Sequence, residues 1–522
     1  MLNLDSGNPA NRTPRVAIIG AGFAGIAAAV KLSTAGIGSF TVFEKSDGVG
    51  GVWRDNTYPG AEVDTPSHWY SFSFRYFDWP RTHGRQADLS RYLNQVTDEF
   101  GVRPHIRFNT AVRSLTWVED RHGYDVELED GSVEEFDVVI SAVGLFNVPR
   151  YPDWPGLDSF EGPLFHTARW EHQHDLSNAH VAIVGTGSTG AQLATALAPT
   201  VKHLTIFQRD PGWITPKGER DLSDSEREKL RDPRHYRRER RRSFLMEQAR
   251  FWGGKQMQAG TKQNAAGQAV GENYIATTFK DREDLRAVVT PNHPFFGKRP
   301  VRATGFYETL LRDNVTFLPR AVDRVTPRGL VDVEGQEHEF DAIVLATGFR
   351  AAEYLGEIEL RGRKGRTIHE RWNGTPDAFV GITVPEFPNF YMLYGPNTNM
   401  GTIVFNLETQ ADYAVRDIKR MRRTGVTAIE TREVFHKAYN RWLQNALRKT
   451  VWTTTPSYYK TPSGKLVVPF PTAMVVYWAL TRLGRRVGSF ERRIRRPHLR
   501  AVASPADPAQ GAPQDEAGRQ SA

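Results

Sequence analysis

The sequence contains no cysteine among its 522 residues. Disulfide bonds, thiolate metal sites and thiol nucleophiles are therefore excluded. Oxidoreductases that work through a redox-active disulfide are excluded for the same reason, because that chemistry needs a pair of cysteines. We predict no metal site.

Long apolar runs and a secretion signal are also missing. No run approaches the roughly 20 apolar residues that a helix needs to cross a bilayer. The N-terminus lacks the order of basic, apolar and small residues that marks a signal peptide. We therefore expect no stable membrane insertion and a cytoplasmic location.

Acidic residues are fewer than basic ones, 60 against 68, which gives a formal net charge of +8. A basic excess can indicate an anionic ligand such as a dinucleotide phosphate, or nucleic acid. Here the cations are spread along the chain, which favours an arginine-rich composition and no nucleic-acid partner. The densest run, Arg237 to Arg242, is interpreted as part of a solvated helical segment, with phosphate binding as the alternative.

A pattern of strand, glycine turn, helix and strand occurs twice, at 15–44 and at 180–207. In each copy a short continuous apolar run ends in glycine, an alanine-rich helical segment follows, and a second apolar run completes a β-α-β unit. The phrases DVVISAVG (Asp137 to Gly144) and DAIVLATG (Asp341 to Gly348) are a second echo, and each follows a polar, hairpin-like stretch. The chain therefore repeats one nucleotide-binding plan.

The first glycine turn fits the pattern GxGxxG with Gly20, Gly22 and Gly25. The first glycine permits the tight turn, the second lets a pyrophosphate approach the backbone, and the third lets helix and strand pack closely. An acidic residue about 20 positions further on is expected to accept hydrogen bonds from ribose hydroxyls, and Glu44 stands there.

The second turn reads Gly185-Thr186-Gly187-Ser188-Thr189-Gly190, and the position that corresponds to Glu44 holds Arg209. An acid at this position repels a ribose 2′-phosphate, whereas a guanidinium can grip it with two hydrogen bonds. The pair of turns therefore predicts a dinucleotide with a free ribose, such as FAD, in the first domain and NADPH in the second.

A chain of this length is too long for one compact core. We predict an α/β protein with two Rossmann-like dinucleotide-binding domains, for FAD and NADPH, and a helical insertion. The predicted parts are the FAD domain at 1–150 and 351–502, the NADPH domain at 151–219 and 296–350, the insertion at 220–295 and a disordered tail at 503–522, which is poor in bulky apolar residues.

The segment before the second glycine turn resembles the fingerprint of the Baeyer–Villiger monooxygenases, a group of the class B flavin monooxygenases. Their pattern is FxGxxxHxxxW followed by Pro or Asp, and Phe160, Gly162, His166 and Trp170 match it. Glu171 departs from the pattern in identity but is still acidic. The resemblance implies that His166 positions the linker between the domains and does not donate a proton.

The resemblance extends over about residues 12–490. Tyr58-Pro59-Gly60-Ala61, Lys298-Arg299 and Gly395-Pro396-Asn397 are similar to family segments at the flavin and the coenzyme. The FAD contacts implied by the glycine turn and the resemblance are Gly20, Gly22, Gly25, Glu44, Gly51, Val52, Trp53, Asp64, Tyr70 and Val112. The NADPH contacts are the second glycine turn, Arg209, Lys298 and Arg299.

Two further departures concern specificity. Asp210 follows Arg209 where several relatives have threonine, and this acid is expected to weaken the 2′-phosphate site. Tyr458 stands in the segment SYYKTPSGK where the family has tryptophan, which leaves the substrate subgroup open.

The resemblance implies an enzyme that inserts one oxygen atom from molecular oxygen beside a ketone or aldehyde carbonyl, through a flavin peroxide, and yields an ester or lactone. Its partners would be a small carbonyl compound and oxygen. Arg299 would stabilise the developing negative charge, because a guanidinium remains charged at any working pH. Asp64 would orient Arg299.

Other functions remain open at this point. One is a flavin monooxygenase that oxidises sulfur or nitrogen centres. Another is a flavoprotein whose nucleotide state controls a partner through the arginine-rich insertion or the basic stretch from Arg492 to Arg500. Residues 472–499 are interpreted as a solvated helix packed near the FAD domain, with a peripheral membrane contact as the alternative.

Overall fold

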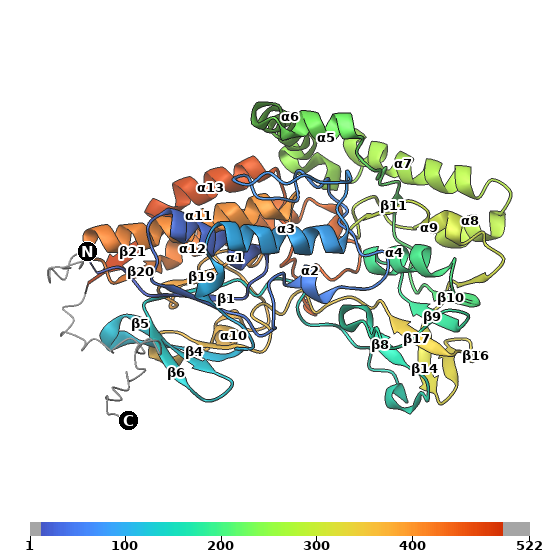
Figure 1. The fold of residues 1–522 in the computed structure, drawn as a ribbon, viewed down its shortest axis with the longest axis horizontal. Coiled ribbons are helices and arrows are strands. Elements are labelled where there is room, and N and C mark those ends of the chain that lie inside the picture. Colours follow the sequence, from blue (N-terminus) through green and yellow to red (C-terminus); the bar gives the residue numbers. More distant parts are fainter. Residues whose placement is uncertain (1–11, 494–522) are drawn as a thin grey trace, which may run out of the picture.

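The computed structural model describes residues 12–493 (Figure 1), and the predicted tail, 503–522, lies outside them. Two five-stranded parallel sheets organise the chain. The first has the order β19 (Phe390–Met392), β7 (Val138–Ser141), β1 (Val16–Ile19), β2 (Phe40–Phe43) and β3 (Ile106–Arg107). The second has the order β13 (Val315–Leu318), β10 (His203–Phe207), β9 (His180–Val184), β17 (Ala342–Leu345) and β8 (Leu164–His166).

The repeat seen in the sequence is a repeat of the fold. β1 lies between β2 and β7, and β9 lies between β10 and β17, in parallel register throughout. The two echoing phrases form β7 and β17, each beside the strand that opens its copy. The predicted α/β fold with two Rossmann-like domains is confirmed.

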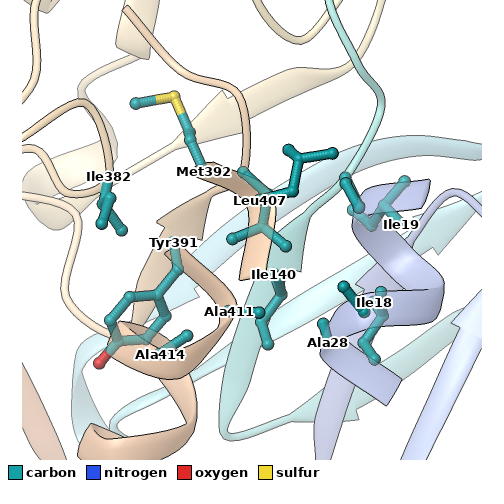
Figure 2. Packing of buried hydrophobic residues seen from close by; sticks show 14 of the residues in the cluster. Ile18, Ile19, Ala28, Ile140, Ile382, Tyr391, Met392, Leu407, Ala411 and Ala414 are labelled. Atoms are coloured by element: carbon teal, nitrogen blue, oxygen red, sulfur yellow. The ribbon is translucent and has the colours of Figure 1, made fainter. Parts of the chain in front are cut away.

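The central strands β1, β7 and β17 are buried along their whole length because helices cover the sheets. In the first copy, α1 (Phe23–Thr34) follows the glycine turn, and α11 (Ile403–Thr424) packs against it. Figure 2 shows this core: Ile18 and Ile140 point from the sheet towards Ala28 of α1 and Ala411 of α11. The small alanine side chains let both helices approach the strands closely. In the second copy, α4 (Ser188–Leu197) takes the place of α1.

Antiparallel strands are added to each copy where the sequence has its polar, hairpin-like stretches. The first addition comprises the antiparallel strands β4 (Val112–Val118), β5 (Gly123–Leu128) and β6 (Val133–Phe136). β18 (Glu359–Arg361), from later in the chain, joins this sheet by pairing with β4 in parallel. The second comprises β14 (Val322–Thr326), β15 (Gly329–Asp332) and β16 (Glu337–Glu339).

The range 220–295 is helical and lies at the upper right of the molecule in Figure 1. It contains α5 (Asp224–Arg231), α6 (Pro233–Phe251), α7 (Lys262–Thr278) and α8 (Glu283–Val289). β11 (Ile214–Thr215) and β12 (Val301–Arg302) pair at its two ends. Within the arginine run of α6, Arg240 donates to the Ser71 carbonyl at 2.8 Å, so this arginine anchors the helix.

The remaining elements complete the two units. They are α2 (Val52–Asp55), α3 (Gln86–Glu99), α9 (Phe306–Thr309), α10 (Ile368–Trp372), β20 (Ala428–Thr431), α12 (Glu433–Leu447), α13 (Met474–Val487) and β21 (Ser489–Arg492). Across residues 12–493, no helix is both long enough and apolar enough to cross a membrane.

Candidate active site

The first glycine turn has the geometry that its sequence predicts. Gly20 has φ 104°, and a Cβ there would lie 2.8 Å from the Ala142 carbonyl oxygen. A Cβ on Gly25 would lie 1.8 Å from the Gly20 carbonyl oxygen, so only glycine lets α1 start this close to β1. Gly22 caps α1 without a side-chain hydrogen bond, and the first turn of α1 holds no acid. These first-turn N–H groups suit an anionic pyrophosphate.

A cavity of about 820 Å³ opens at this turn. Its volume lies within the range that small-molecule and cofactor sites occupy. Gly51 lies opposite the turn. A Cβ on Gly51 would be 3.1 Å from the Gly22 Cα, so the two segments can approach this closely because Gly51 has no side chain. The predicted FAD contacts that line the cavity are Gly20, Gly22, Glu44, Gly51, Val52, Tyr70 and Val112. The glycine cradle and its open donors therefore fit FAD.

Glu44 has a role that the sequence did not reveal. Its carboxylate accepts from the Ala21 N–H at 2.6 Å and from the Ser46 N–H at 2.9 Å. Because Ala21 lies inside the glycine turn, Glu44 holds the turn in place as well as lining the cavity.

Trp53 and Tyr70 form one unit on the cavity wall. The Trp53 Nε1–H donates to the Tyr70 hydroxyl oxygen at 3.1 Å, and the two rings meet edge to face. Burial raises the pKa of Tyr70 to about 12, so the phenol keeps its proton. With its oxygen accepting from Trp53, Tyr70 has its own O–H to donate into the cavity that it lines. Trp53 supports Tyr70 from outside the lining.

Arg299 stands where the two nucleotide-binding units meet. Its Nη2 donates to the Asp64 carboxylate from the first unit, and its Nη1 donates to Ser188 Oγ of the second glycine turn at 3.3 Å. Arg299 also lines the large cavity, whereas Asp64 lies behind it with 15% of its side chain exposed. The structure thus brings three predicted site residues from distant parts of the chain into one hydrogen-bonded group.

The electrostatics of this group keep both partners charged. Burial raises the pKa of Asp64, but the positive charges of Arg299, Arg302 and Lys217 outweigh it and hold that pKa below its ordinary value. The Asp64 carboxylate in turn raises the pKa of Arg299 further above its already high value, against the effect of burial. Arg299 is therefore a permanent cation at the cavity wall.

A second ion pair joins the units two residues away from Asp64. Lys217 is completely buried, and its Nζ binds the Glu62 carboxylate. The Glu62 carbonyl oxygen also accepts from the Gln192 Nε2–H at 2.9 Å, on α4. Sequence reasoning missed Lys217, because no motif marks a single lysine far from its partner in the chain.

The second glycine turn repeats the geometry of the first. Gly185 has φ 109°, and a Cβ on Gly190 would lie 1.9 Å from the Gly185 carbonyl oxygen. Around Gly187 the space is open: a Cβ there would meet no atom within 4 Å. α4 has no side-chain cap and no acid in its first turn. Open space and uncapped N–H groups fit the pyrophosphate of a second dinucleotide.

Arg209 and Lys298, the predicted 2′-phosphate ligands, converge on Asp210. The Arg209 Nε–H donates to the Asp210 carboxylate at 3.1 Å, and the Lys298 Nζ lies 3.6 Å from the same oxygen. Arg209 is 77% exposed, with its terminal nitrogens outside this hydrogen bond. Asp210 therefore holds two cations close together, although its charge opposes that of a phosphate.

The fingerprint residues lie in and around β8, at the edge of the second sheet. His166 is fully buried, and its Nδ1 accepts from the Ala168 N–H at 3.1 Å. Burial lowers the pKa of His166 to about 4, so it is neutral. Trp170 packs edge to face on Phe165. Through this hydrogen bond, His166 holds the backbone that follows β8.

Two other fingerprint residues are packing positions. A Cβ on Gly162 would lie 2.7 Å from the Asp341 carbonyl oxygen and 2.8 Å from the Phe160 ring. Only glycine fits between them.

The Tyr58-Pro59-Gly60-Ala61 stretch contacts α4. The Tyr58 hydroxyl donates to Gln192 Oε1 at 2.9 Å, and a Cβ on Gly60 would lie 2.8 Å from the Gln192 carbonyl oxygen. Tyr58, Gly60 and Ala61 line a second cavity of about 500 Å³. This stretch therefore fixes one unit on the other, and Asp64 follows directly from it.

Comparison with known proteins gives matches that cover about nine tenths of the chain. The family described as pyridine nucleotide-disulphide oxidoreductase matches residues 17–232. Because the chain has no cysteine, that match reflects the nucleotide-binding plan and not disulfide chemistry. A Baeyer–Villiger monooxygenase of Streptomyces coelicolor is 37% identical over 494 residues, which cover 92% of this chain and 93% of that protein.

Solved structures agree with the sequence matches. Cyclohexanone monooxygenase from Rhodococcus sp. Phi1, bound to NADP+, superposes with a TM-score of 0.83 at 30% identity, covering 92% of this chain and 99% of the other. The OTEMO complex with FAD and NADP gives a TM-score of 0.83 at 26% identity, and the superposition covers 92% of this chain and 100% of the OTEMO chain.

Proposed function

Because the chain belongs to the Baeyer–Villiger monooxygenases, within the class B flavin monooxygenases, we propose that it inserts one oxygen atom beside the carbonyl of a ketone or aldehyde. The product is an ester or a lactone. The enzyme is an NADPH-dependent flavin monooxygenase, and its cofactors are FAD and NADPH. When bound, these cofactors supply the electrons and the activation of molecular oxygen.

The observation that carries this proposal is the position of Arg299. Attack on a carbonyl carbon places negative charge on the carbonyl oxygen, and a fixed cation aimed at that oxygen lowers the barrier. Arg299 lines the large cavity and is held from both units, by Asp64 and by Ser188. Its charge does not depend on pH in the working range.

Asp64 acts as a positioning residue in this proposal. Its ion pair with Arg299 fixes the direction of the guanidinium, and its lowered pKa keeps the carboxylate ionised. Because Arg299 is already fixed in place, it need not move when negative charge develops on the carbonyl oxygen. A preorganised cation of this kind stabilises that charge most effectively.

We divide the predicted cofactor contacts between FAD and NADPH by their position on the cavity wall and in the two glycine turns. The first turn, Glu44, Gly51, Val52, Tyr70 and Val112 would hold FAD, with Gly25 and Trp53 as supports. The second turn, Arg209 and Lys298 would hold NADPH, with Arg299 between the two. Tyr70 can donate its O–H into the cavity and so help to orient a polar group there.

A substrate panel tests the proposal. The purified, flavin-loaded protein is incubated with NADPH and a range of ketones, aldehydes, thioethers and amines, and oxygen uptake and product mass are measured. We expect substrate-stimulated oxygen uptake with ketones or aldehydes and products that have gained one oxygen atom as esters or lactones. If thioethers or amines are oxidised and no carbonyl compound is converted, the runner-up activity, oxidation of sulfur or nitrogen, is the correct one.

A further inference from the structure

Helices α12 and α13 are antiparallel neighbours, joined by residues that lie between them, and α13 also packs on α11; α13 is at the upper left of the molecule in Figure 1. At one end the Arg432 N–H, just before α12, donates to the Gly488 carbonyl at the end of α13, at 2.7 Å. Near the other end the Phe470 ring joins the two helices, with Trp442 at 6.3 Å and Tyr477 at 5.3 Å between ring centroids.

Both helices turn one side to the core and leave the opposite side exposed. The buried positions are Met474, Tyr477 and Thr481 on α13 and His436, Tyr439, Leu443 and Leu447 on α12. Phe379 packs between the helices, against Tyr439 and beside Gly484. We call the exposed sides of these two neighbouring helices, taken together, the α12–α13 face.

Large apolar side chains are exposed on this face. Their exposed fractions are 74% for Leu483, 67% for Val434, 53% for Val487, 41% for Trp442 and 39% for Trp478. Single exposed apolar residues are common on protein surfaces, but five on two adjacent helices are a feature of surfaces that bind something. The two tryptophans are of the type that is enriched where protein meets the headgroup region of a bilayer.

The charge of the face is almost entirely positive. Its exposed cations are Arg432, Lys437, Arg441, Arg448, Lys449, Arg482 and Arg486. α13 contains no acid, and the only acid of α12, Glu433, pairs with Arg371 and Lys437. Among residues 12–493, no ion pair is formed by Arg441, Lys449 or Arg486. Exposed apolar residues and cations without an ion-pair partner, on the same two helices, complement an anionic, partly apolar surface.

We propose that the α12–α13 face binds the surface of membranes that contain anionic lipids. A nucleic acid would match the cations but leave Leu483 and Val487 exposed to water, whereas a lipid surface buries both kinds of side chain. No residue of the face lines the large cavity, so this binding is separate from the proposed oxygen insertion. It requires no membrane-spanning helix.

Vesicle sedimentation with the flavin-loaded full chain tests the proposal. The vesicles are phosphatidylcholine alone, or an equal mixture of phosphatidylcholine and phosphatidylglycerol. We expect binding to the mixed vesicles only, and weaker binding as salt shortens the Debye length from about 10 Å at 0.1 M to about 3 Å at 1 M. The triple variant Arg441→Gln, Lys449→Gln, Arg486→Gln should bind more weakly by about fivefold for each cation removed.

Matched variants show whether binding depends on the α12–α13 face or only on the total charge and exposed apolar area of the protein. Lys202→Gln, Lys229→Gln, Lys262→Gln removes three exposed cations elsewhere and should bind as the unchanged chain does. Leu483→Ser with Val487→Ser should lose binding, whereas Val133→Ser with Val333→Ser, at 56% and 59% exposure, should keep it. A chain that ends at Arg493 should still bind, because the face does not depend on the arginines that follow. Oxygen uptake with NADPH confirms that each variant is folded.

Several results would overturn the proposal. They are equal binding to both vesicle types, equal losses in the control variants, loss of binding when the chain ends at Arg493, and duplex DNA that binds the face more tightly than the mixed vesicles. A concentration-dependent dimer that the Leu483→Ser, Val487→Ser variant abolishes would assign the face to a second copy of the chain.

Discussion

Arg299 and Asp64, 235 positions apart in the chain, form an ion pair that joins the two nucleotide-binding units. The pair places a permanent cation on the wall of a cavity of about 820 Å³, beside both glycine turns. This relationship links the fold to the proposed chemistry, because neither unit alone could hold Arg299 in that position.

Coenzyme choice should depend on Arg209 and Asp210. Arg209→Ala removes a charge-assisted contact worth roughly 1.5–3 kcal/mol, so the Michaelis constant for NADPH should rise on the order of tenfold to a hundredfold. Asp210→Asn keeps an acceptor for the Arg209 Nε–H and removes a negative charge near the 2′-phosphate, so it should lower that constant. Steady-state kinetics with NADPH and NADH measure both. Equal changes with the two coenzymes would show that Arg209 and Asp210 act structurally.

Gly187 and Gly190 should fail in different ways when replaced by alanine. At Gly187 the added Cβ meets no protein atom within 4 Å, so Gly187→Ala should fold normally and only weaken NADPH binding. At Gly190 it would lie 1.9 Å from a carbonyl oxygen, so Gly190→Ala should lower the thermal midpoint as well. NADPH titration and thermal unfolding are the measurements. If Gly187→Ala binds NADPH as the unchanged protein does, the pyrophosphate lies elsewhere.

The local parts of this structure could be predicted from the sequence. The spacing of Gly20, Gly22 and Gly25 after an apolar run predicts a strand, a turn and a helix, and Gly20 and Gly25 each meet a steric limit set by neighbouring backbone. Repetition of that pattern predicted the second sheet. Glu44 was found by its distance from the turn, but its hydrogen bond to Ala21 was not, because spacing does not show which donor a carboxylate meets.

The contacts between the units were harder to predict. Asp64 and Arg299 were found through family resemblance, and no periodic pattern connects them. Lys217 and Glu62, 155 positions apart, carry no motif at all. Such pairs depend on how two folded units dock, which local patterns do not encode. From the sequence, the segment of α13 could be either a solvated helix or a membrane contact. The basic and apolar residues of α12, which extend the exposed side of α13, lie about 40 residues earlier, so the sequence did not connect them.

Lys217 should be important for stability. Removing one partner of a buried ion pair leaves an uncompensated charge and costs about 3–5 kcal/mol. Glu62 is 16% exposed, so Lys217→Met should destabilise by about 3 kcal/mol. The double variant Glu62→Gln, Lys217→Met should recover much of the loss. Lys280→Met, in an exposed pair, is the control and should change stability by less than about 0.5 kcal/mol. Denaturant unfolding that ranks the two lysine variants equally would contradict the assignment.

Buried histidines should make the folded state less stable at acidic pH. Burial lowers the pKa of His166 to about 4 and, together with nearby cations, lowers that of His83 to about 4. An unfolded histidine has a pKa of about 6.5. Since the folded-state pKa is the lower one, the unfolded chain binds more protons, and stability present above about pH 6.5 is lost as the pH falls towards 4. Each histidine adds a slope of up to about 1.4 kcal/mol per pH unit.

His166→Asn tests this pH dependence. Asparagine keeps an acceptor for the Ala168 N–H but does not titrate. The thermal midpoint of this variant should therefore fall less steeply between pH 6.5 and 4 than that of the unchanged protein. His369→Asn, at an exposed position, is the control. An unchanged slope for His166→Asn would mean that folding does not lower the pKa of His166.

The yield of oxygenated carbonyl product per NADPH consumed, compared between the unchanged enzyme and Arg299→Ala, tests the central claim most directly. Arg299→Ala should still bind FAD and accept hydride from NADPH, but lose ester or lactone formation by about 3–4 kcal/mol, or two to three orders of magnitude. Arg299→Lys should recover only part of it, because an ammonium lacks the planar fork that holds Asp64 and Ser188 together. Unchanged product yield in Arg299→Ala would contradict the account.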